Sequence, residues 1–412
     1  MATSDQGNNR LPLIAIFLLF VVDAIGVGLM FPVMPDLIRE ITGDTLSNAA
    51  LWGGVMATSF AAMQFLFSPT IGALSDRWGR RPVLLISLFI MFIDYIVMAL
   101  THSIWMLMLL RIVSGLTAAN FSVGNAYLAD ITPPEKRAAS FGLFGAGFGI
   151  GFVAGPILGG MLAEYGSRTP FYAAALLSFA NFLFVAFVLP ETVKNTTRKL
   201  PSLSEINPLG AFLRLIKLPT LRILLIIVLL NEIAVVVYPS IWSFFTMEVF
   251  GWSPRQVGLS LSFYGISMAI VQAIVIRIYL RYLGELGTLL IGLALNIVVF
   301  CIMLFLTNAA IAMALIPLSA LGAVILPPVK SMMSRKMPAT VQGELLGVVS
   351  STASIGAIFG PLIATYSFRM FSGDEAPVYL PGVPFGIGAV LLMISLALAV
   401  IYLRNDATDD SH

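Results

Sequence analysis

The stretch LPLIAIFLLFVVDAIGVGLMFPVMP, residues 11–35, decides the class of fold. It holds a single charged residue, Asp23, and as an α-helix it is long enough to cross a hydrocarbon core about 30 Å thick. At ~1.5 Å per residue, Asp23 lies roughly 18 Å from Leu11, near the bilayer centre. An aspartate at that depth costs about 2.5–3.5 kcal/mol. We therefore expect Asp23 to be a proton carrier, a substrate contact or a buried structural ion.

The rest of the chain has the same membrane character. Hydrophobic residues occupy 58% of the 412 positions and charged residues 11%, against about 25% charged in a typical soluble domain. Apolar runs of spanning length recur twelve times, at residues 11–35, 50–73, 82–100, 104–128, 139–163, 170–190, 221–246, 257–280, 286–306, 309–330, 342–369 and 380–403. We predict an all-α membrane protein with twelve transmembrane helices in two pseudo-symmetric six-helix bundles.

The longest polar connection, residues 191–219, divides the chain into two halves. It separates a predicted N-terminal bundle, residues 1–190, from a C-terminal bundle, residues 220–412, and is itself expected to be a cytoplasmic loop. With the N-terminus placed inside, 18 of the 23 lysines and arginines fall in cytoplasmic segments and 4 in outside loops. Positive charge favours the cytoplasmic side, so both termini are predicted to be cytoplasmic.

The two halves also share short motifs. GPILGG at 155–160 is matched by GPLIA at 360–364, an offset of 205 residues, and the same offset relates Gly79 to Gly284. Internal repeats occur in transporters whose binding site lies near the bilayer midplane. The matches indicate a duplicated architecture of this kind.

Several kinds of chemistry have no support in the sequence. Cys301 is the only cysteine, and His102 and His412 are the only histidines, so we expect no disulfide, no metal site and no cofactor. A G-x-x-x-x-G-K-[ST] loop is absent, which argues against ATP-driven pumping. We predict neither an enzyme nor a nucleic-acid-binding protein, because no nucleophile motif and no basic face stand out.

The loop after the second span reads GALSDRWGRR, residues 72–81. Gly72 allows close helix approach, Asp76 can pair with a basic group, and Gly79 suits a tight turn. The arginines Arg77, Arg80 and Arg81 can hold the loop at the anionic inner leaflet. We interpret the loop as a gate on the inner side, with a simple topology anchor as the alternative.

Two further features are expected to serve gating. In the fifth span, Gly151, Gly155 and Gly159 form one smooth face and Pro156 weakens the helix, which favours tight packing, with or without a role in sealing the outward path. At the inner end of the fourth span, Asp130 and Arg137 flank a Pro-Pro turn. This pattern is typical of a cytoplasmic latch or of a solvated loop.

Charged residues inside the spans are candidates for proton coupling. Asp94 and Arg111 lie at similar depth, roughly 10 Å below the turn that joins their adjacent helices, and can reach one another. They form either a structural ion pair or part of a switch. Glu232 lies in the first span of the second half, where a buried carboxyl group can exchange a proton near neutral pH. A glutamate at the headgroup level is the alternative.

Polar and aromatic residues inside the spans complete a candidate substrate cavity. Amides are costly in lipid unless they are paired, so they are expected to face the protein interior. Any one of them can instead bond only to a neighbouring helix. An amphipathic cavity of this kind suits a drug-sized organic molecule. The candidates are Gln64, Asn120, Asn231, Trp242, Phe245, Tyr264, Met268, Gln272 and Asn296.

Together these residues resemble the major facilitator superfamily, and within it the tetracycline-efflux branch of drug:proton antiporters. The resemblance covers nearly the whole chain and is densest in the first half, including residues 11–40, QFLFSPTIGALSDRWGRRPVLLISL, AYLADITPPEKRA, FGIGFVAGPILGG and LPET. It implies a role in transport or gating for Asp23, Gln64, Asp76, Arg80, Asp94, Arg111, Asp130, Arg137 and Gln272.

The sequence departs from that branch at two positions. Asn296 replaces the coupling aspartate of the ninth span, and Met268 replaces a histidine found in the eighth span of many tetracycline pumps. We hypothesise that Glu232 takes over the acidic role of the second half.

The resemblance implies a secondary transporter of the bacterial inner membrane that works by alternating access. The expected activity is export of an amphipathic organic compound in exchange for protons, with membrane lipid as surroundings and a monomer as the functional unit. An importer or facilitator of a small metabolite on the same fold is the first alternative. A sensor or scaffold that does not transport is the second.

Overall fold

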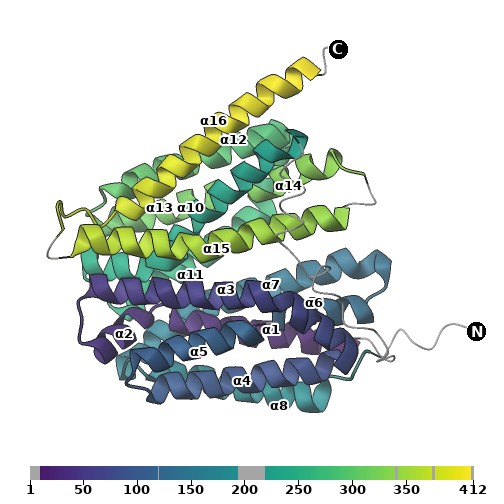
Figure 1. Ribbon diagram of the computed structural model, residues 1–412, viewed down its shortest axis with the longest axis vertical. Helices are drawn as coiled ribbons and strands as arrows, with labels where there is room; N and C mark the ends of the chain where they lie inside the picture. The colour runs from purple at the N-terminus through teal and green to yellow at the C-terminus, as the bar shows by residue number, and fades with distance from the viewer. Residues whose placement is uncertain (1–9, 119, 194–218, 339–341, 374–375, 410–412) are drawn as a thin grey trace, which may run out of the picture. The chain divides into compact units, whose positions relative to one another are not determined.

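The computed structural model describes residues 10–118, 120–193, 219–338, 342–373 and 376–409 (Figure 1). The regular structure of these residues is helical. The α-helices are α1 Arg10–Met30, α2 Met34–Thr42, α3 Leu46–Trp78, α4 Arg80–Leu100, α5 Ile104–Thr117, α6 Asn120–Ile131, α7 Arg137–Leu162, α8 Thr169–Val188, α10 Pro219–Phe250, α11 Pro254–Ile270, α12 Ile276–Leu304, α13 Ala309–Gly322, α14 Leu326–Arg335, α15 Gln342–Ser372 and α16 Val383–Asp409. Short 3-10 turns, η1 Pro134–Lys136 and η2 Ala163–Tyr165, and a π-helical segment, η3 Val271–Val275, join them.

Twelve membrane spans are recovered from these helices. Eleven helical stretches of the described residues are long and apolar enough to cross a membrane, and one of them, Pro254–Leu304, has 51 residues. That stretch turns at Gly284, whose φ of 65° is outside the helical range. The turn separates the predicted eighth and ninth spans, so the prediction of a twelve-helix membrane protein is confirmed. Most of the predicted central loop, residues 194–218, lies outside the described residues.

Two spans predicted as single helices are broken. The span predicted at 104–128 consists of α5 and α6, and the span predicted at 309–330 consists of α13 and the start of α14. Neither break has a proline at the point where the first helix stops, since Ala118 and Ala323 are the residues that follow α5 and α13. The break at Ala118 therefore has no proline signal, whereas Pro327 and Pro328 at the start of α14 mark the second break.

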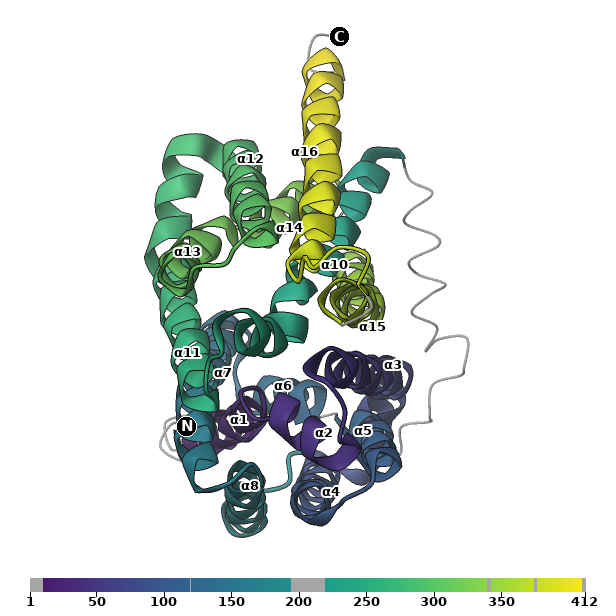
Figure 2. The ribbon, with the colours of Figure 1, turned by 90° about the vertical axis from the view of Figure 1, so that its left-hand side faces the viewer.

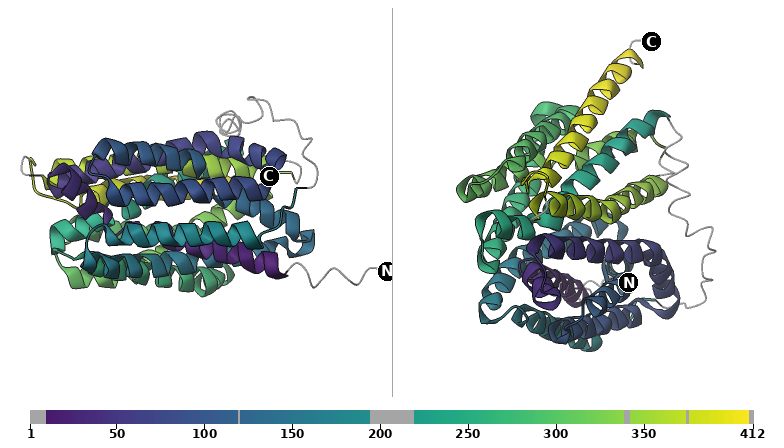
Figure 3. Two further views of the ribbon diagram at one scale, coloured as in Figure 1. Left: turned by 90° about the horizontal axis from the view of Figure 1, so that it is seen from below. Right: turned by 60° about the vertical axis from the view of Figure 1, so that its left-hand side comes forward.

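The described residues fall into two compact units by their contacts. Unit 1 contains the described residues within Met1–Gly43, Ser59–Ile206 and Ser253–Ser262, and unit 2 those within Asp44–Thr58, Asn207–Trp252 and Phe263–His412. The helices of each unit run alongside one another, as Figure 3 shows for α4 and α8 of unit 1. Each unit has a core of its own.

The core of unit 1 lies between α1, α4, α6 and α8. α1 packs along α7 and α8, and α4 packs along α8 and α6 (Figure 2). Phe20, Leu84, Tyr127 and Val185, one from each of the four core helices, are at most 1% exposed within this cluster. The helices that carry Asp23 and Asp94, α1 and α4, both contribute side chains to this cluster.

The α1–α7 contact of unit 1 is made through glycines. A Cβ atom built on Gly151 would lie 2.5 Å from the Val21 carbonyl oxygen, and one on Gly155 would lie 2.7 Å from Cα of Gly28. At Gly159 it would lie 2.3 Å from the backbone oxygen of Leu29. The tight packing predicted from this glycine face is confirmed, with α1 as the partner helix.

Unit 2 is built on α10. This helix packs along α15 and α16, and α12 packs along α16 and α13. Phe300 of α12 and Phe385 of α16 are buried beside the α10 residue Tyr238, with ring centroids 6.1 and 5.6 Å from it. Aromatic contacts therefore join three helices of this unit.

A polar clasp closes one end of unit 1, outside the membrane-spanning segments. Glu40 of α2 accepts hydrogen bonds from Ser167 Oγ at 2.5 Å and Arg168 Nε at 2.9 Å. Arg168 also donates to the carbonyl oxygens of Ala99 and Thr101. The hydrogen bond from Ser167 and the nearby guanidinium of Arg168 hold the pKa of the Glu40 carboxyl below its usual 4.5.

We expect Glu40→Gln to lower the free energy of unfolding by roughly 0.2–1 kcal/mol at pH 7, the size typical of exposed ion pairs. Because the pKa of Glu40 is lowered by folding, its contribution is present above the unfolded-state pKa and is lost as pH falls through the folded-state value. Denaturation midpoints in detergent at pH 7 and near pH 3 check this. A variant whose deficit grows as the solution is acidified contradicts it.

Candidate functional site

Asp23 lies in α1 and is bound by an amide of the broken fourth span. Asn120 Nδ2, at the start of α6, donates to Asp23 Oδ1 at 3.3 Å. Nearby on α1, Gly26 packs on the Tyr95 hydroxyl, which would lie 3.3 Å from a Cβ at that glycine. The carboxyl group thus has a neutral hydrogen-bond donor and a buried phenol one turn away. Sequence reasoning selected Asn120 but missed Tyr95, whose only signal was its position after Asp94.

Asp94 and Arg111 form the predicted buried ion pair. Arg111 Nη2 lies 2.5 Å from Asp94 Oδ2, and the two side chains are 11% and 4% exposed, respectively. Met98 accepts a further contact from the same guanidinium nitrogen at 2.9 Å. Asp94 Oδ1 and Arg111 Nε are buried without a hydrogen-bond partner among the described residues. The pair is therefore only partly satisfied.

Arg80 is the centre of the inner cluster of unit 1. Its guanidinium pairs with Asp76, donates to Asp130 Oδ2 at 3.2 Å and to Ser75 Oγ at 2.6 Å, and is only 9% exposed as a side chain. Asp76 therefore has the basic partner that its motif predicts. The same arginine joins the end of α3 to the end of α6, a contact that the sequence did not indicate.

Glu191 caps the N-terminus of α4. Its carboxylate accepts the backbone N–H groups of Arg80 at 2.9 Å and Arg81 at 3.1 Å. The preceding Gly79 has φ 106°, and a Cβ there would lie 2.3 Å from Glu191 Oε2. A negative charge at a helix N-terminus is favourable. Glu191 belongs to the LPET segment, but no feature of the sequence assigned it this contact.

We expect Glu191→Ala to lower the free energy of unfolding by about 1–2 kcal/mol, because it frees two N–H groups of the first turn of α4. Glu135→Ala is the matched control, since Glu135 is an exposed glutamate in the short turn η1. It should change stability by less than about 0.5 kcal/mol. Chemical denaturation in detergent compares them, and equal midpoints for the two variants contradict the capping role.

The other predicted gating residues of unit 1 make fewer side-chain contacts than Arg80 does. Arg137 donates to the carbonyl oxygens of Thr132 and Ala129, so Asp130 finds its partner in Arg80 instead. Arg77 is exposed, and Arg81 donates to the Ala186 carbonyl oxygen. No described atom lies within 4 Å of a Cβ built on Gly72. The close approach expected at Gly72 is not made in this structure.

In unit 2, Glu232 and Asn231 lie side by side in α10. Glu232 packs on Gly356 of α15, where a Cβ would lie 2.7 Å from Glu232 Cβ, and the charge of Lys330 acts on it. Asn231 is 5% exposed, and its amide oxygen accepts no hydrogen bond from the described residues. The pair presents one acid and one unsatisfied acceptor.

The predicted aromatic residues of unit 2 are packed together. Trp242 and Phe245 are each 1% exposed, and Tyr238 stacks on Trp242 and Tyr264 at 4.9 and 5.7 Å between ring centroids. Met268 and Tyr264 pack against a buried cluster that includes Val271. In this structure the aromatic rings pack against one another, as they do in a hydrophobic core.

Three predicted amides bond to backbone carbonyls. Gln64 donates to Ala118 at 3.2 Å, Gln272 to Ala323 at 3.3 Å and Asn296 to Gly322 at 3.0 Å. These carbonyls all lie at the breaks of the fourth and tenth spans. The alternative foreseen for such amides, a bond to a neighbouring helix, is realised at all three.

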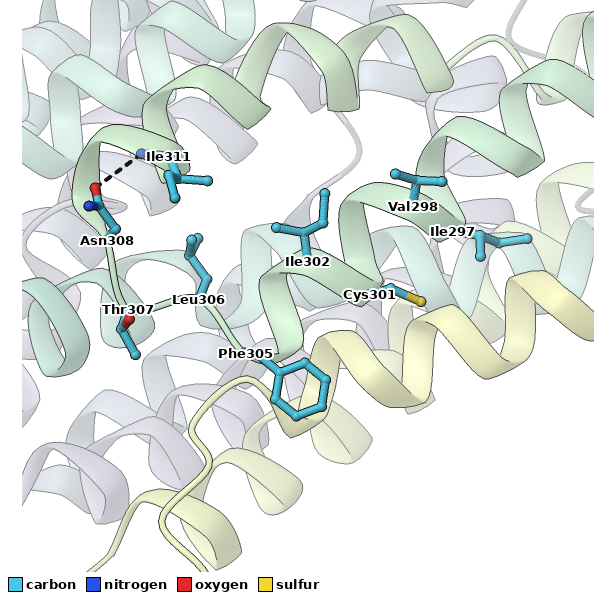
Figure 4. A pocket seen from close by; sticks show the side chains of 9 residues that line it. All are labelled: Ile297, Val298, Cys301, Ile302, Phe305, Leu306, Thr307, Asn308 and Ile311. Carbon is cyan, nitrogen blue, oxygen red and sulfur yellow. Dashed lines mark hydrogen bonds between the residues drawn. The ribbon is translucent and has the colours of Figure 1, made fainter.

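A separate hollow of 560 Å³ lies between the end of α12 and the start of α13 (Figure 4). It is lined mainly by apolar side chains, among them Ile302 and Ile311, which are 40% and 47% exposed. Exposed aliphatic side chains of a membrane span are expected to face lipid. The hollow holds none of the predicted site residues.

Membrane-length helices in two compact units, with carboxyl groups and an ion pair inside the spans, define a polytopic membrane transporter. The family model described as Major Facilitator Superfamily matches residues 16–361 and 224–412. The chain belongs to this superfamily.

Named relatives agree with this assignment. The class C tetracycline resistance protein of Escherichia coli is 36% identical over 391 residues, 95% of this chain and 96% of that protein. The quinolone resistance protein NorA of Staphylococcus aureus is 27% identical over 92% of this chain and 94% of its own length. The fold matches a bacterial homolog of the human lysosomal transporter Spinster with a TM-score of 0.78 at 16% identity, covering 98% and 99% of the two chains. The chain is a multi-pass membrane protein whose relatives include tetracycline and quinolone resistance proteins.

Proposed function

We propose that this protein exports an amphipathic organic compound of the drug type across the bacterial inner membrane in exchange for protons. The bond between Asp23 and Asn120 in the middle of a membrane span carries the proposal. An acid at that depth is costly unless it is used, and proton relays are its commonest use in transporters. The tetracycline and quinolone resistance relatives support export of a drug-sized molecule.

The proposed mechanism is alternating access of two halves, residues 1–190 and 220–412, with both termini in the cytoplasm. Asp23 and Glu232 bind and release the protons, and Arg111 holds Asp94 ionised between cycles. The cluster around Arg80, together with Glu191, closes the inner side. One pH unit is worth about 1.4 kcal/mol per proton, so exchange of one proton for one neutral molecule supports roughly tenfold accumulation per pH unit.

Substrate contacts are proposed for the polar and aromatic residues near these acids. The amide oxygens of Asn120 and Asn231 are buried and accept no bond from the described residues, so each can accept one from a substrate or from water. Asn296, Trp242, Phe245, Tyr264 and Met268 are proposed to form the apolar and amide walls in a conformation other than the described one, in which the rings pack against one another. We propose that the protein works as a monomer surrounded by lipid.

The test is substrate flux in proteoliposomes with an imposed pH gradient. A panel that contains tetracycline, a quinolone and small polar metabolites is offered to vesicles with acidic or alkaline interiors. We expect accumulation of an amphipathic drug in acid-interior vesicles only. Accumulation of a metabolite in alkaline-interior vesicles would instead show a proton-coupled importer. No flux of any compound would leave the non-transporting sensor as the better description.

A further inference from the structure

Two membrane spans break at matched positions of the repeat. α5 ends at Thr117 and is followed by Ala118 with φ −70° and ψ 44°, and α13 ends at Gly322 and is followed by Ala323 with φ −78° and ψ 34°. The two alanines are 205 residues apart, the offset that also relates Gly79 to Gly284. Those glycines share a positive φ, of 106° and 65°. The break is therefore a duplicated feature of the fold.

Each break is bonded to one glutamine of a neighbouring span. Gln64 of the second span donates to the Ala118 carbonyl oxygen at 3.2 Å, and Gln272 of the eighth span donates to the Ala323 carbonyl oxygen at 3.3 Å. A helix that stops inside a membrane leaves carbonyl groups without intrahelical partners, and a free one there costs several kcal/mol. The two amides supply a missing partner at equivalent points.

Close packing brings the first glutamine to its break. A Cβ built on Gly115 would lie 2.5 Å from the Phe60 carbonyl oxygen and 2.8 Å from Met63 Cβ. The backbones of α3 and α5 therefore touch one turn before Ala118, next to Gln64. In unit 2 the glycine beside the break is Gly322, the last residue of α13, and the Asn296 amide packs on it.

The two glutamines are not at the same position of the repeat. Gln64 comes 15 residues before Gly79, whereas Gln272 comes 12 residues before Gly284. The difference of three residues is about one helical turn, which keeps both side chains on one face. Gln272 also belongs to a π-helical segment, a local feature common at functional sites. The shared feature is the contact with the break, rather than an aligned residue.

The breaks separate groups that the proposed mechanism couples. In unit 1 the break lies between Arg111, the partner of Asp94, and Asn120, the partner of Asp23. In unit 2 the carbonyl group before Ala323 accepts from Asn296, which replaces the family's acid. A bend at Ala118 would change the separation of the two acidic sites of unit 1.

We propose that Gln64 and Gln272 are matched positioning residues of two hinges, at Ala118 and Ala323, that bend during the transport cycle. The inference rests on the proposed transport function and gives both residues a role other than direct substrate contact. Each glutamine holds its hinge in one conformation by satisfying the carbonyl that the break exposes.

Cysteine labelling measures how often each hinge opens, in the absence of any substrate. Ala118→Cys or Ala323→Cys is introduced in a Cys301→Ser background, and labelling by N-ethylmaleimide is timed in proteoliposomes. Gln64→Leu should speed labelling at position 118 by about three- to tenfold, the range of one net hydrogen bond, and leave position 323 unchanged. Gln272→Leu should do the reverse. Equal rates with and without the glutamine, or a change at both positions at once, overturn the proposal.

Control variants separate hinge opening from a general loss of structure. Thr117→Val removes only the bonds to the Val113 and Ser114 carbonyl oxygens within α5, and Ser267→Ala only one to Phe263 within α11. Both should label at the parent rate. In proteins that keep Cys301, its labelling rate should be the same with and without the leucine substitutions. Faster labelling of Cys301 would show unfolding and count against the hinges.

A second arm tests the link to transport with tetracycline as the probe. The leucine variants should bind tetracycline in detergent with a Kd within twofold of the parent, while the maximal transport rate falls about tenfold. A raised Kd with an unchanged maximal rate supports direct contact and overturns the positioning role. If the unmodified protein does not move tetracycline, the transport proposal fails for this compound. The labelling experiment still decides the hinge proposal.

Discussion

Asp94→Ala is expected to lower the free energy of unfolding by about 3–5 kcal/mol. The substitution leaves the Arg111 guanidinium, 11% exposed, without the carboxylate that lies 2.5 Å away. A single buried charge in that position has lost its Coulomb partner and cannot regain its water. Chemical denaturation in detergent measures the loss, and the yield of folded protein should fall with it.

The double variant Asp94→Ala/Arg111→Met is the informative control. Removing both charges removes the desolvation cost as well, so most of the stability should return. A single variant with the parent's midpoint would contradict the account of this pair. Transport by the double variant then separates the two interpretations. A stable protein that no longer couples protons indicates a switch, and one with full activity indicates a structural pair.

Gly159→Leu is expected to disrupt unit 1 through the α1–α7 contact. The first added carbon atom would already lie 2.3 Å from the backbone oxygen of Leu29, and backbone cannot move aside as a flexible side chain can. Forcing extra methylenes into a packed interface costs about 1–3 kcal/mol or more. Thermal denaturation should show a lowered midpoint. Transport should also fall, because α1 and α7 no longer pack closely against one another.

The smaller substitution Gly159→Ala allows a matched control on the same helix. Nothing lies within 4 Å of a Cβ built on Gly149. Gly149→Ala should therefore be neutral or stabilising by up to about 1 kcal/mol, since alanine favours a helix over glycine. Gly159→Ala should be destabilising despite the same helix propensity gain. If both alanine variants are equally stable, α7 does not pack on α1 as described.

Contacts between neighbours in sequence could be predicted. Asp94 and Arg111 flank one short turn, so counting residues placed them at the same depth, and the structure joins them. The glycines Gly151, Gly155 and Gly159 repeat at four-residue spacing, which defines a helix face without any knowledge of its partner. In both cases local periodicity contained the information.

Contacts between distant segments could not be predicted. Arg80 meets Asp130 and Glu191 across 50 and 111 residues of sequence. No pattern in the chain distinguishes Asp130 as a partner of Arg80 from Asp130 as a partner of the nearby Arg137. The helix breaks were hidden for a different reason. Ala118 and Ala323 themselves favour helices, although Pro327 and Pro328 follow the second break, and the glutamine bonds that stabilise the breaks come from other spans.

The aromatic residues show that composition alone does not predict whether a side chain lines a cavity or packs in a core. Trp242, Phe245 and Tyr264 were expected to form the aromatic walls of an amphipathic cavity, together with the polar residues inside the spans. In the structure Trp242 and Phe245 are buried, and Tyr264 stacks on Tyr238. Aromatic rings supply the same apolar area to a core and to a binding site. Sequence alone cannot tell which of the two a given ring serves.

The most direct test of proton coupling is drug accumulation by the Asp23→Asn protein in acid-interior proteoliposomes. The unmodified protein should concentrate the exported drug about tenfold per pH unit. Asp23→Asn removes the titratable group but keeps the side-chain size, so it should exchange drug down its gradient and fail to concentrate it. Glu135→Gln, an exposed substitution in the 3-10 turn η1, should behave as the unmodified protein. Glu232→Gln, assayed in parallel, should lower coupling if Glu232 acts in the second half. An Asp23→Asn protein that still accumulates drug in proportion to the pH gradient contradicts the central claim.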